Sequence, residues 1–352
     1  MTRLKFKLAP MGICFSWLLL GVACGEITPP DTNKDVAQKS TDTLRLALDW
    51  SPNVLHAPIF WAEKQGYFSE AGLSVEWFST EIDNYKKKPI QRLLDREVDL
   101  CIGPSEHLFY LAVDSMGRAR AEAVATILQR DQSCFVVKAE SEIRRPRDLE
   151  GKTYVGYKTP LEKQVLGAII EHEGGNPDFK MITPGRLDVW EAFVNGKGDV
   201  AWVFSHWEAI MAVQEGVQVR KFYPGDHGVP YGYSSVIMAR KERTDEMNQH
   251  LATFLKVMSR SVDEMLAEAD GKVANQLCDH IEHQNFDDEI FIAAAWSDIK
   301  PAFVASDSSD WGSMQAQKWN EWMSWISQHH HEADRIDNLP AADQFYDNSL
   351  LP

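Results

Sequence analysis

The sequence lacks the short motifs that mark the commonest catalytic and phosphate-binding sites. It contains no G-x-x-x-x-G-K-[ST] phosphate loop, no H-E-x-x-H, no G-x-S-x-G and no C-x-x-C pair. These absences argue against a P-loop nucleotide hydrolase, a zinc protease of that class, a serine esterase and a paired-cysteine zinc domain. Catalytic residues and cofactors are therefore not predicted.

Cysteine is scarce, with five residues in the whole chain. Beyond the N-terminal segment and Cys24, only Cys101, Cys134 and Cys278 remain. An odd number of cysteines without C-x-x-C spacing predicts neither a disulfide framework nor a zinc site. Buried free thiols are the default expectation, while a bridge from Cys134 to either of the others stays open.

Positive charge is also in short supply, since 36 Lys and Arg face 52 Asp and Glu for a net charge of −16. Such a surface argues against nucleic-acid partners and against peripheral binding to anionic lipid.

The N-terminus carries the positive charge that targeting requires. Arg3, Lys5 and Lys7 precede the apolar residues 8–23, which predicts a signal peptide over residues 1–23, too short to span a bilayer. Its ending, LGVAC, resembles a bacterial lipobox, so Cys24 is the predicted lipidation site that would tether the protein to a membrane surface. An ordinary cleaved signal with Cys24 as a stray thiol is the alternative.

The rest of the chain predicts a two-lobed α/β architecture. Residues 24–42 are polar and predict a flexible stalk. Strand and helix patterns then alternate as in an open, mostly parallel sheet, restart, and return. We expect lobe one at 43–135 and 233–346, and lobe two at 136–232. Two crossings between lobes predict a hinged cleft, and ligands of such sheets bind at the carboxyl ends of strands.

Residues 48–60, LDWSPNVLHAPIF, open the most specific motif. It comprises Asp49, Trp50, Pro52, Asn53, His56, Gly66, Tyr67, Phe68, Gly72 and Leu73. This motif closely resembles the opening of the NMT1/THI5-like proteins, which include bacterial solute-binding proteins that deliver thiamine-precursor pyrimidines to ABC transporters. Similar segments, among them REVDLCIG, GDVAWVFSHWEAI and HGVPYGYSSVIMARKE, extend it over residues 43–330.

The resemblance implies a type II periplasmic binding-protein fold, with two α/β lobes around a hinged cleft. It further implies an extracytoplasmic, monomeric, non-enzymatic protein whose partners are a small-molecule ligand and an ABC transporter permease. The family also has a fungal branch that makes the pyrimidine from its own histidine and a lysine-bound pyridoxal phosphate. Gly103 stands in place of that lysine, His107 stands where the reactive histidine falls, and residues 231–238 replace the cysteine-rich motif, so the synthase activity is not expected.

Candidate ligand-binding residues in lobe one follow two predicted strands. Trp50 can stack on a flat ligand or pack in the core, Asn53 can bind a ring edge or cap a helix, and His56 can face the cleft or brace its loop. Ser105 and Glu106 start a helix, where Glu106 would suit an amino group or simply complement the helix dipole.

Candidates in lobe two also follow strands. Tyr157 and Thr159 lie in a strand-to-helix turn, where Thr159 and Glu162 alternatively form a capping box. Trp207 and Glu208 follow a buried strand and correspond to a frequent aromatic–glutamate pair in the family.

Tyr231 and Tyr233 lie where the chain returns to lobe one, and they can line the cleft or pack the hinge. The predicted ligand is a small heteroaromatic amine, by resemblance a thiamine pyrimidine precursor, with riboflavin, a sulfonate such as taurine, or another nitrogenous compound as alternatives. A sulfonate is disfavoured because these loops carry no cation apart from Lys158. A sensory or scaffolding relative that has lost transport is a further alternative.

The run 329–331, three histidines, is expected to be a solvated helix end and not a metal site.

Overall fold

The computed structural model describes residues 42–115, 117–157, 159–185, 188–305, 310–329 and 339–352. The predicted signal peptide, Cys24 and the stalk before residue 42 lie outside these residues, as do Lys158, His330 and His331. Within the described part, no helix has both the length and the apolar character needed to cross a membrane.

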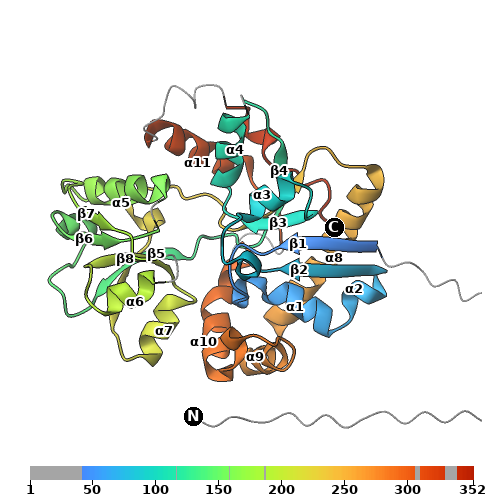
Figure 1. The fold of residues 1–352 in the computed structure, drawn as a ribbon, viewed down its shortest axis with the longest axis horizontal. Coiled ribbons are helices and arrows are strands. Elements are labelled where there is room, and N and C mark those ends of the chain that lie inside the picture. Colours follow the sequence, from blue (N-terminus) through green and yellow to red (C-terminus); the bar gives the residue numbers. More distant parts are fainter. Residues whose placement is uncertain (1–41, 116, 158, 186–187, 306–309, 330–338) are drawn as a thin grey trace, which may run out of the picture. The chain divides into compact units, whose positions relative to one another are not determined.

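In the described part of the chain, ten strands form two five-stranded sheets (Figure 1). Lobe one is built on the order β2-β1-β3-β10-β4, and lobe two on β7-β6-β8-β5-β9. The strands are β1 (Asp42–Ala47), β2 (Leu73–Phe78), β3 (Leu100–Gly103), β4 (Ala121–Thr126), β5 (Ser133–Lys138), β6 (Thr153–Val155), β7 (Lys180–Ile182), β8 (Val200–Phe204), β9 (Val219–Phe222) and β10 (Val236–Arg240).

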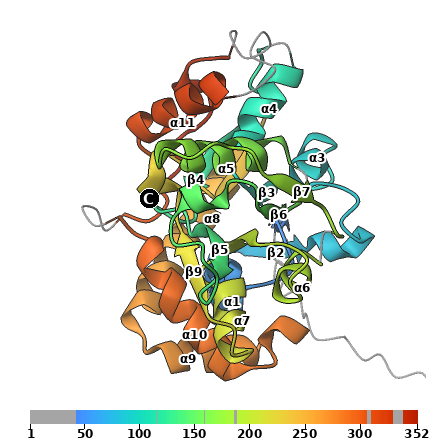
Figure 2. The ribbon, with the colours of Figure 1, turned by 90° about the vertical axis from the view of Figure 1, so that its left-hand side faces the viewer.

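Helices cover the sheets, as the alternating pattern predicts. They are α1 (Ala57–Lys64), α2 (Tyr67–Glu70), α3 (Pro89–Leu94), α4 (Glu106–Asp114), α5 (Pro160–His172), α6 (Val189–Val194), α7 (Glu208–Gln214), α8 (Asp245–Ala267), α9 (Asp270–Cys278), α10 (Glu289–Ile299) and α11 (Ala316–His329). The apolar stripes predicted on α8 and α11 are buried, for example Phe254 and Trp322. Helices α4 and α11 lie side by side in both views (Figures 1 and 2), with the rings of Phe109 and Trp319 edge to face.

Central strands are buried on both faces, which explains their continuous apolar runs. In β5, Cys134 and Val136 pack on one side of the sheet while Phe135 and Val137 pack on the other. The buried Cys101 and Cys134 and the half-buried Cys278 are free thiols, so neither alternative disulfide is present.

One strand in each sheet runs against the other four, namely β10 in lobe one and β5 in lobe two. Each of them is the first strand after a crossing between lobes. The prediction of mostly parallel sheets is thus confirmed. Because β10 and β5 are reversed, their amino ends lie at the same sheet edges as the carboxyl ends of their neighbours.

The two crossings, residues 127–132 and 223–235, run together for part of their length, since the Ile127 amide donates to the Ser235 carbonyl at 2.9 Å. The predicted boundary after residue 135 falls within β5, and we propose that the first lobe boundary lies in the crossing before Ser133. Strand β9 was not predicted, because its sequence VRKF carries two charged residues at the edge of the sheet.

The C-terminal segment adds to the edge of lobe one. Strand β4 is an edge strand of its sheet, and Ala123 forms a parallel bridge with Tyr346. The Ala123 amide donates to the Phe345 carbonyl, and the Asp347 amide donates to the Ala123 carbonyl, both at 2.9 Å. Phe345 is fully buried, so the chain end is part of the lobe-one core.

Candidate functional site

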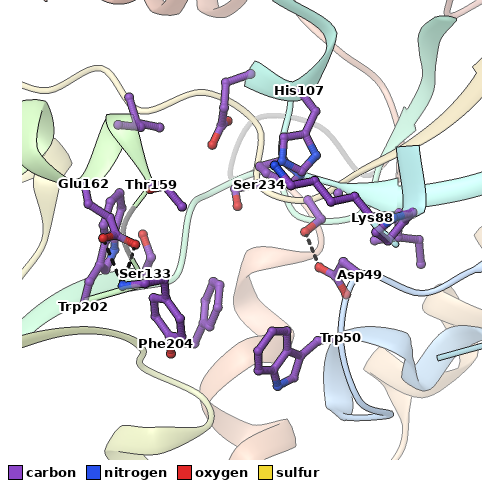
Figure 3. Close-up of a pocket in the computed structure, with 18 of the residues that line it drawn as sticks. Asp49, Trp50, Lys88, His107, Ser133, Thr159, Glu162, Trp202, Phe204 and Ser234 are labelled. Atoms are coloured by element: carbon purple, nitrogen blue, oxygen red, sulfur yellow. Dashed lines mark hydrogen bonds between the residues drawn. The ribbon is translucent and has the colours of Figure 1, made fainter. Parts of the chain in front are cut away.

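A cavity of about 1040 Å³ is lined by residues of both lobes. Its walls come from the loops after β1, β3, β6 and β8, together with the residues just before β10 and at the start of β5. These are the sheet edges at which strand ends of the two lobes gather, so the topology places the cavity where the sequence predicts a cleft. Figure 3 shows side chains of lobe two, such as Trp202 and Phe204, facing Asp49 and Trp50 of lobe one.

Asp49 joins three segments of lobe one. Its Oδ1 lies 2.9 Å from His56 Nε2, and its Oδ2 accepts a hydrogen bond from the Ser235 hydroxyl at 2.9 Å. The Asn53 amide donates to His56 Nδ1 at 3.2 Å, so Nε2 carries the proton that His56 donates to Asp49. Burial alone would raise the pKa of Asp49, but the bonds from His56 and Ser235 outweigh it and lower that pKa. Asp49 is thus held as a carboxylate.

His56 is fully buried and does not line the cavity, so it braces the loop, which is one of the two predicted roles. Asn53 lines the cavity, but its side chain is occupied. Its Oδ1 accepts the Leu55 amide at 2.9 Å and its Nδ2 donates to the Ser51 carbonyl at 3.0 Å, which makes it the cap of the short helix Val54–His56. The capping alternative is therefore the role that the structure shows for Asn53.

The ring of Trp50 contacts two other aromatic rings, one of them from lobe two. The centroid of its ring lies 4.9 Å from that of Tyr85 and 6.4 Å from that of Tyr157 in lobe two. The ring planes of Trp50 and Tyr157 are at 80° to each other. Aromatic pairs in contact have centroids about 4.5–7 Å apart. Trp50 and Tyr157 therefore touch edge to face, which brings an aromatic ring of each lobe together in the cavity.

Glu106 is buried on the first turn of α4 and lines the cavity. The Tyr231 hydroxyl donates to its Oε1 at 3.0 Å, which joins lobe one to the returning crossing. Burial raises the pKa of Glu106 to about 7, although the helix amide and the Tyr231 hydroxyl oppose the rise. Near neutrality the group can donate to a ring nitrogen as an acid or accept from an amino group as a carboxylate.

The parent protein should lose free energy of unfolding as the pH rises, because Glu106 then ionises. In Glu106→Gln, which cannot ionise, we expect this loss to be absent. The unfolded side chain ionises near 4.5 and the folded one near 7, so the folded form holds its proton more tightly across this interval. The stability that this provides is full below pH 4.5 and is lost as the pH rises through about 7, by roughly 3 kcal/mol. Urea unfolding of both proteins at pH 5, 6, 7 and 8 measures the difference; parallel curves would contradict the assignment.

The turn after β6 differs from the predicted capping box. Thr159 is the N-cap of α5, but its side chain is exposed and makes no capping hydrogen bond. Glu162 instead accepts the Tyr157 amide through both carboxylate oxygens, each at 3.1 Å. A carboxylate reaching the amide five residues back fixes the turn in place of the threonine hydroxyl, and Glu162 is nearly buried beside the cavity.

The loop after β8 is folded back on itself. Glu208 Oε2 accepts the Phe204 amide at 2.9 Å, and burial raises the pKa of Glu208. Trp207 lines the cavity and packs edge to face on Phe291 of α10 at 4.8 Å. His206 is buried, and burial lowers its pKa to about 3, so it is neutral.

Five cavity-lining side chains have a buried polar atom to which no described residue is hydrogen-bonded. They are Thr80 Oγ1 and Glu106 Oε2 in lobe one, and Gln164 Oε1, Trp202 Nε1 and His206 Nδ1 in lobe two. A buried polar atom normally has a hydrogen-bond partner, because leaving it unpaired costs about 1–3 kcal/mol. Both lobes therefore offer unpaired polar atoms to a ligand or to water, and these atoms include donors and acceptors.

The structure brings together most of the predicted ligand-binding residues. Those that line the cavity are Trp50, Asn53, Glu106, Tyr157, Thr159, Trp207, Glu208 and Tyr231. Ser105 and Tyr233 do not line it: Ser105 is fully buried, and the Tyr233 hydroxyl accepts the Gln315 amide at 2.8 Å, so it packs the hinge against the segment before α11.

Several lining residues were not predicted, among them Asp49, Lys88, His107, Ser133, Trp202, Phe204, His206, Ser234 and Ser235. Asp49 and His107 were noticed in motifs but not assigned to the site. Lys87, Lys88 and Lys163 also line the cavity, so it carries cations from outside the predicted loops, and the composition of those loops alone does not disfavour a sulfonate.

One group outside the cavity has the composition of a metal site. His172, Glu173 and His227 bring ligand atoms within 4.8 Å of one another at the C-terminal end of α5, and His227 Nδ1 lies 3.0 Å from Glu173 Oε1. The prediction that the protein holds no metal stays a prediction. His329 bonds instead to the Trp325 carbonyl of its own helix.

Comparison with known proteins places the chain. A family model described as NMT1/THI5 like matches residues 53–271, more than half of the sequence. The chain belongs to the NMT1/THI5-like family. It is 25% identical over 301 residues to the formylaminopyrimidine-binding protein of Halalkalibacterium halodurans, covering 85% of this chain and 88% of that protein.

Enzymes are also among the relatives of this NMT1/THI5-like chain. The 4-amino-5-hydroxymethyl-2-methylpyrimidine phosphate synthase THI13 of Saccharomyces cerevisiae is 25% identical over 161 residues, which is 46% of this chain and 45% of that protein.

A solved structure supports the fold. The periplasmic aliphatic sulphonate binding protein SsuA from Escherichia coli superposes with a TM-score of 0.65 at 13% identity, covering 87% of this chain and 92% of that one. The predicted two-lobed periplasmic binding-protein fold is thus confirmed.

Proposed function

We propose that this protein is the solute-binding component of an ABC importer and that its cleft captures a small heteroaromatic ligand with an amino group, of the thiamine pyrimidine-precursor class. The observation that carries the proposal is the pairing of Trp50 and Tyr157 from opposite lobes across the cavity. Glu106 and Glu208, which line the same cavity, suit the amino and ring-nitrogen edge of such a ligand. The name of the Halalkalibacterium halodurans relative supports the same class.

We further propose that the protein binds without chemistry, although some relatives are named synthases. Gly103 occupies the end of β3 where the resemblance implies the lysine of the fungal branch. A Cβ there would lie 3.0 Å from Met238 Cε and 3.2 Å from His107 Nδ1, so the position has no room for a long side chain without rearrangement. Incubation followed by mass spectrometry should recover the bound pyrimidine unchanged.

The remaining parts of the proposal concern location and partners. The protein is secreted, carries a lipid on Cys24, acts as a monomer outside the cytoplasm, and passes its ligand to a membrane permease. Lobe closure around the ligand would present the form that the permease recognises. Metabolic labelling with palmitate, compared with Cys24→Ser, tests the anchor.

A thermal-shift screen of the chain from residue 24 tests the ligand class. The panel holds aminopyrimidine precursors, thiamine, riboflavin and taurine. A ligand at about 100 times its Kd should stabilise the protein by about 2.7 kcal/mol and raise the melting temperature. A shift with aminopyrimidines supports the proposal, whereas a shift with riboflavin or taurine alone would replace the ligand and keep the fold.

A further inference from the structure

Lys88 is a cavity-lining lysine of lobe one whose ammonium has no partner among the described residues. Lys88 immediately precedes α3, its backbone is extended, and its exposed side chain lines the cavity. Its carbonyl accepts the Gln91 and Arg92 amides, but its ammonium makes no hydrogen bond and no ion pair with a described residue. Its neighbour Lys87 also lines the cavity, but the ammonium of Lys87 lies 2.5 Å from both Asp95 and Glu97. Of these two adjacent cations, only Lys88 is available to a ligand.

A neutral histidine lies beside this lysine. Figure 3 shows the ring of His107 next to the Lys88 side chain, above Ser234. Burial first, and the charge of Lys88 second, lower the pKa of His107 to about 4, so it is uncharged near neutrality. The His107 ring lies close to the end of β3, and glycine at position 103 leaves room for it. A Cβ at Gly103 would lie 3.2 Å from His107 Nδ1, which is a tight contact. No described residue forms a hydrogen bond with this imidazole.

The third group is the hydroxyl of Ser234, which lines the cavity just before β10 and has no hydrogen bond among the described residues. The Asp49 carboxylate lines the same cavity, and its charge acts on His107. Its two oxygens already accept bonds from His56 and Ser235. It forms no ion pair with Lys88, so Lys88 is not held as its counterion.

We infer that Lys88, His107 and Ser234 form a subsite for an anionic group carried by the ligand. An ammonium, an imidazole N–H and a hydroxyl converge as three donors, which suits a phosphate, sulfonate or carboxylate. Trp50 lines the same cavity, so one ligand can stack its ring on Trp50 and place its anionic group in the subsite. The inference rests on the proposed function, because it defines the chemical class of the ligand in the same cleft.

The test compares two ligands that differ by one anionic group. Calorimetry at pH 7.5 measures the Kd of 4-amino-5-hydroxymethyl-2-methylpyrimidine and of its phosphate monoester. We expect the phosphate to bind at least about 10-fold tighter, because a charged hydrogen-bond donor contributes that much. Lys88→Gln should abolish the preference and leave the uncharged compound within twofold. Lys87→Gln, the matched control with the same change in charge, should keep the preference.

The outcomes separate this inference from the proposed function. Equal affinity for the two compounds, unchanged in Lys88→Gln, would overturn the anionic subsite and leave the pyrimidine-binding function standing. Binding of neither compound, and no binding of taurine, would overturn both. Taurine has an anion and no ring; if it binds, and Lys88→Gln abolishes its binding, the subsite stands and the aromatic ligand class falls.

Discussion

Asp49→Ala will lower the free energy of unfolding by about 2–5 kcal/mol. The substitution removes the acceptor for two buried donors, because His56 is 0% exposed and Ser235 is 4% exposed. Each unpaired buried donor costs about 1–3 kcal/mol. The same carboxylate joins the end of β1 to the short helix Val54–His56 and to the returning crossing before β10, so its loss loosens the whole lobe-one side of the cleft. Urea unfolding at pH 7 measures the effect.

Asp49→Asn is the matched control for this prediction. Its carbonyl oxygen can accept the His56 Nε2–H, and its amide can donate to the Ser235 hydroxyl, so most of the stability should return. If Asp49→Asn were as unstable as Asp49→Ala, the negative charge and not the hydrogen bonds would hold the loop. Surface substitutions usually change the free energy of unfolding by less than about 0.5 kcal/mol. A change that small in Asp49→Ala would contradict the proposed role of Asp49.

The second large effect concerns affinity. Trp50→Ala is expected to weaken binding of an aminopyrimidine by about 10-fold to 100-fold, because stacking of a base on an aromatic side chain contributes about 1–3 kcal/mol. Trp50 is half-buried and lines the cavity, so its removal should change the melting temperature of the unliganded protein little. Calorimetric titration at pH 7.5 measures the change.

Two variants control the tryptophan experiment. Trp50→Phe keeps an aromatic face and should retain most of the affinity. Trp190→Ala removes a half-buried tryptophan of α6 that bonds to Glu215 away from the cavity, and it should bind as the parent does. Affinity unchanged in Trp50→Ala would place the ligand elsewhere and remove the main support for an aromatic ligand.

The fold was predictable because periodicity and connection order carry it. The stripe on α8, which includes Leu251 and Met258, has helical spacing and is buried as predicted. The sequence also predicted a strand before residue 242 at which the chain returns to lobe one, and this strand is β10. Strand β9 escaped prediction because an edge strand with Arg220 and Lys221 shows no apolar run.

The site was predictable in its location and only partly in its residues. Every predicted loop lies at the cavity, since strand ends of α/β sheets gather there. The direction of a side chain within a loop depends on its bonds, which is why His56 and Tyr233 turn inward to Asp49 and to the segment before α11. Lys88 was missed because it precedes a helix in a different loop, and only the tertiary fold brings it next to His107.

The last residues of the chain have a consequence for aggregation. An edge strand offers unpaired amides and carbonyls to strands of other molecules, and proteins commonly cover or interrupt such edges. Here the Phe345 carbonyl and the Asp347 amide occupy the outward-facing groups of Ala123 in β4. The buried ring of Phe345 fixes this cover to the core. A chain shortened before residue 345 would expose β4 as a template for intermolecular pairing, so the C-terminal segment protects the protein from self-association as well as completing its core.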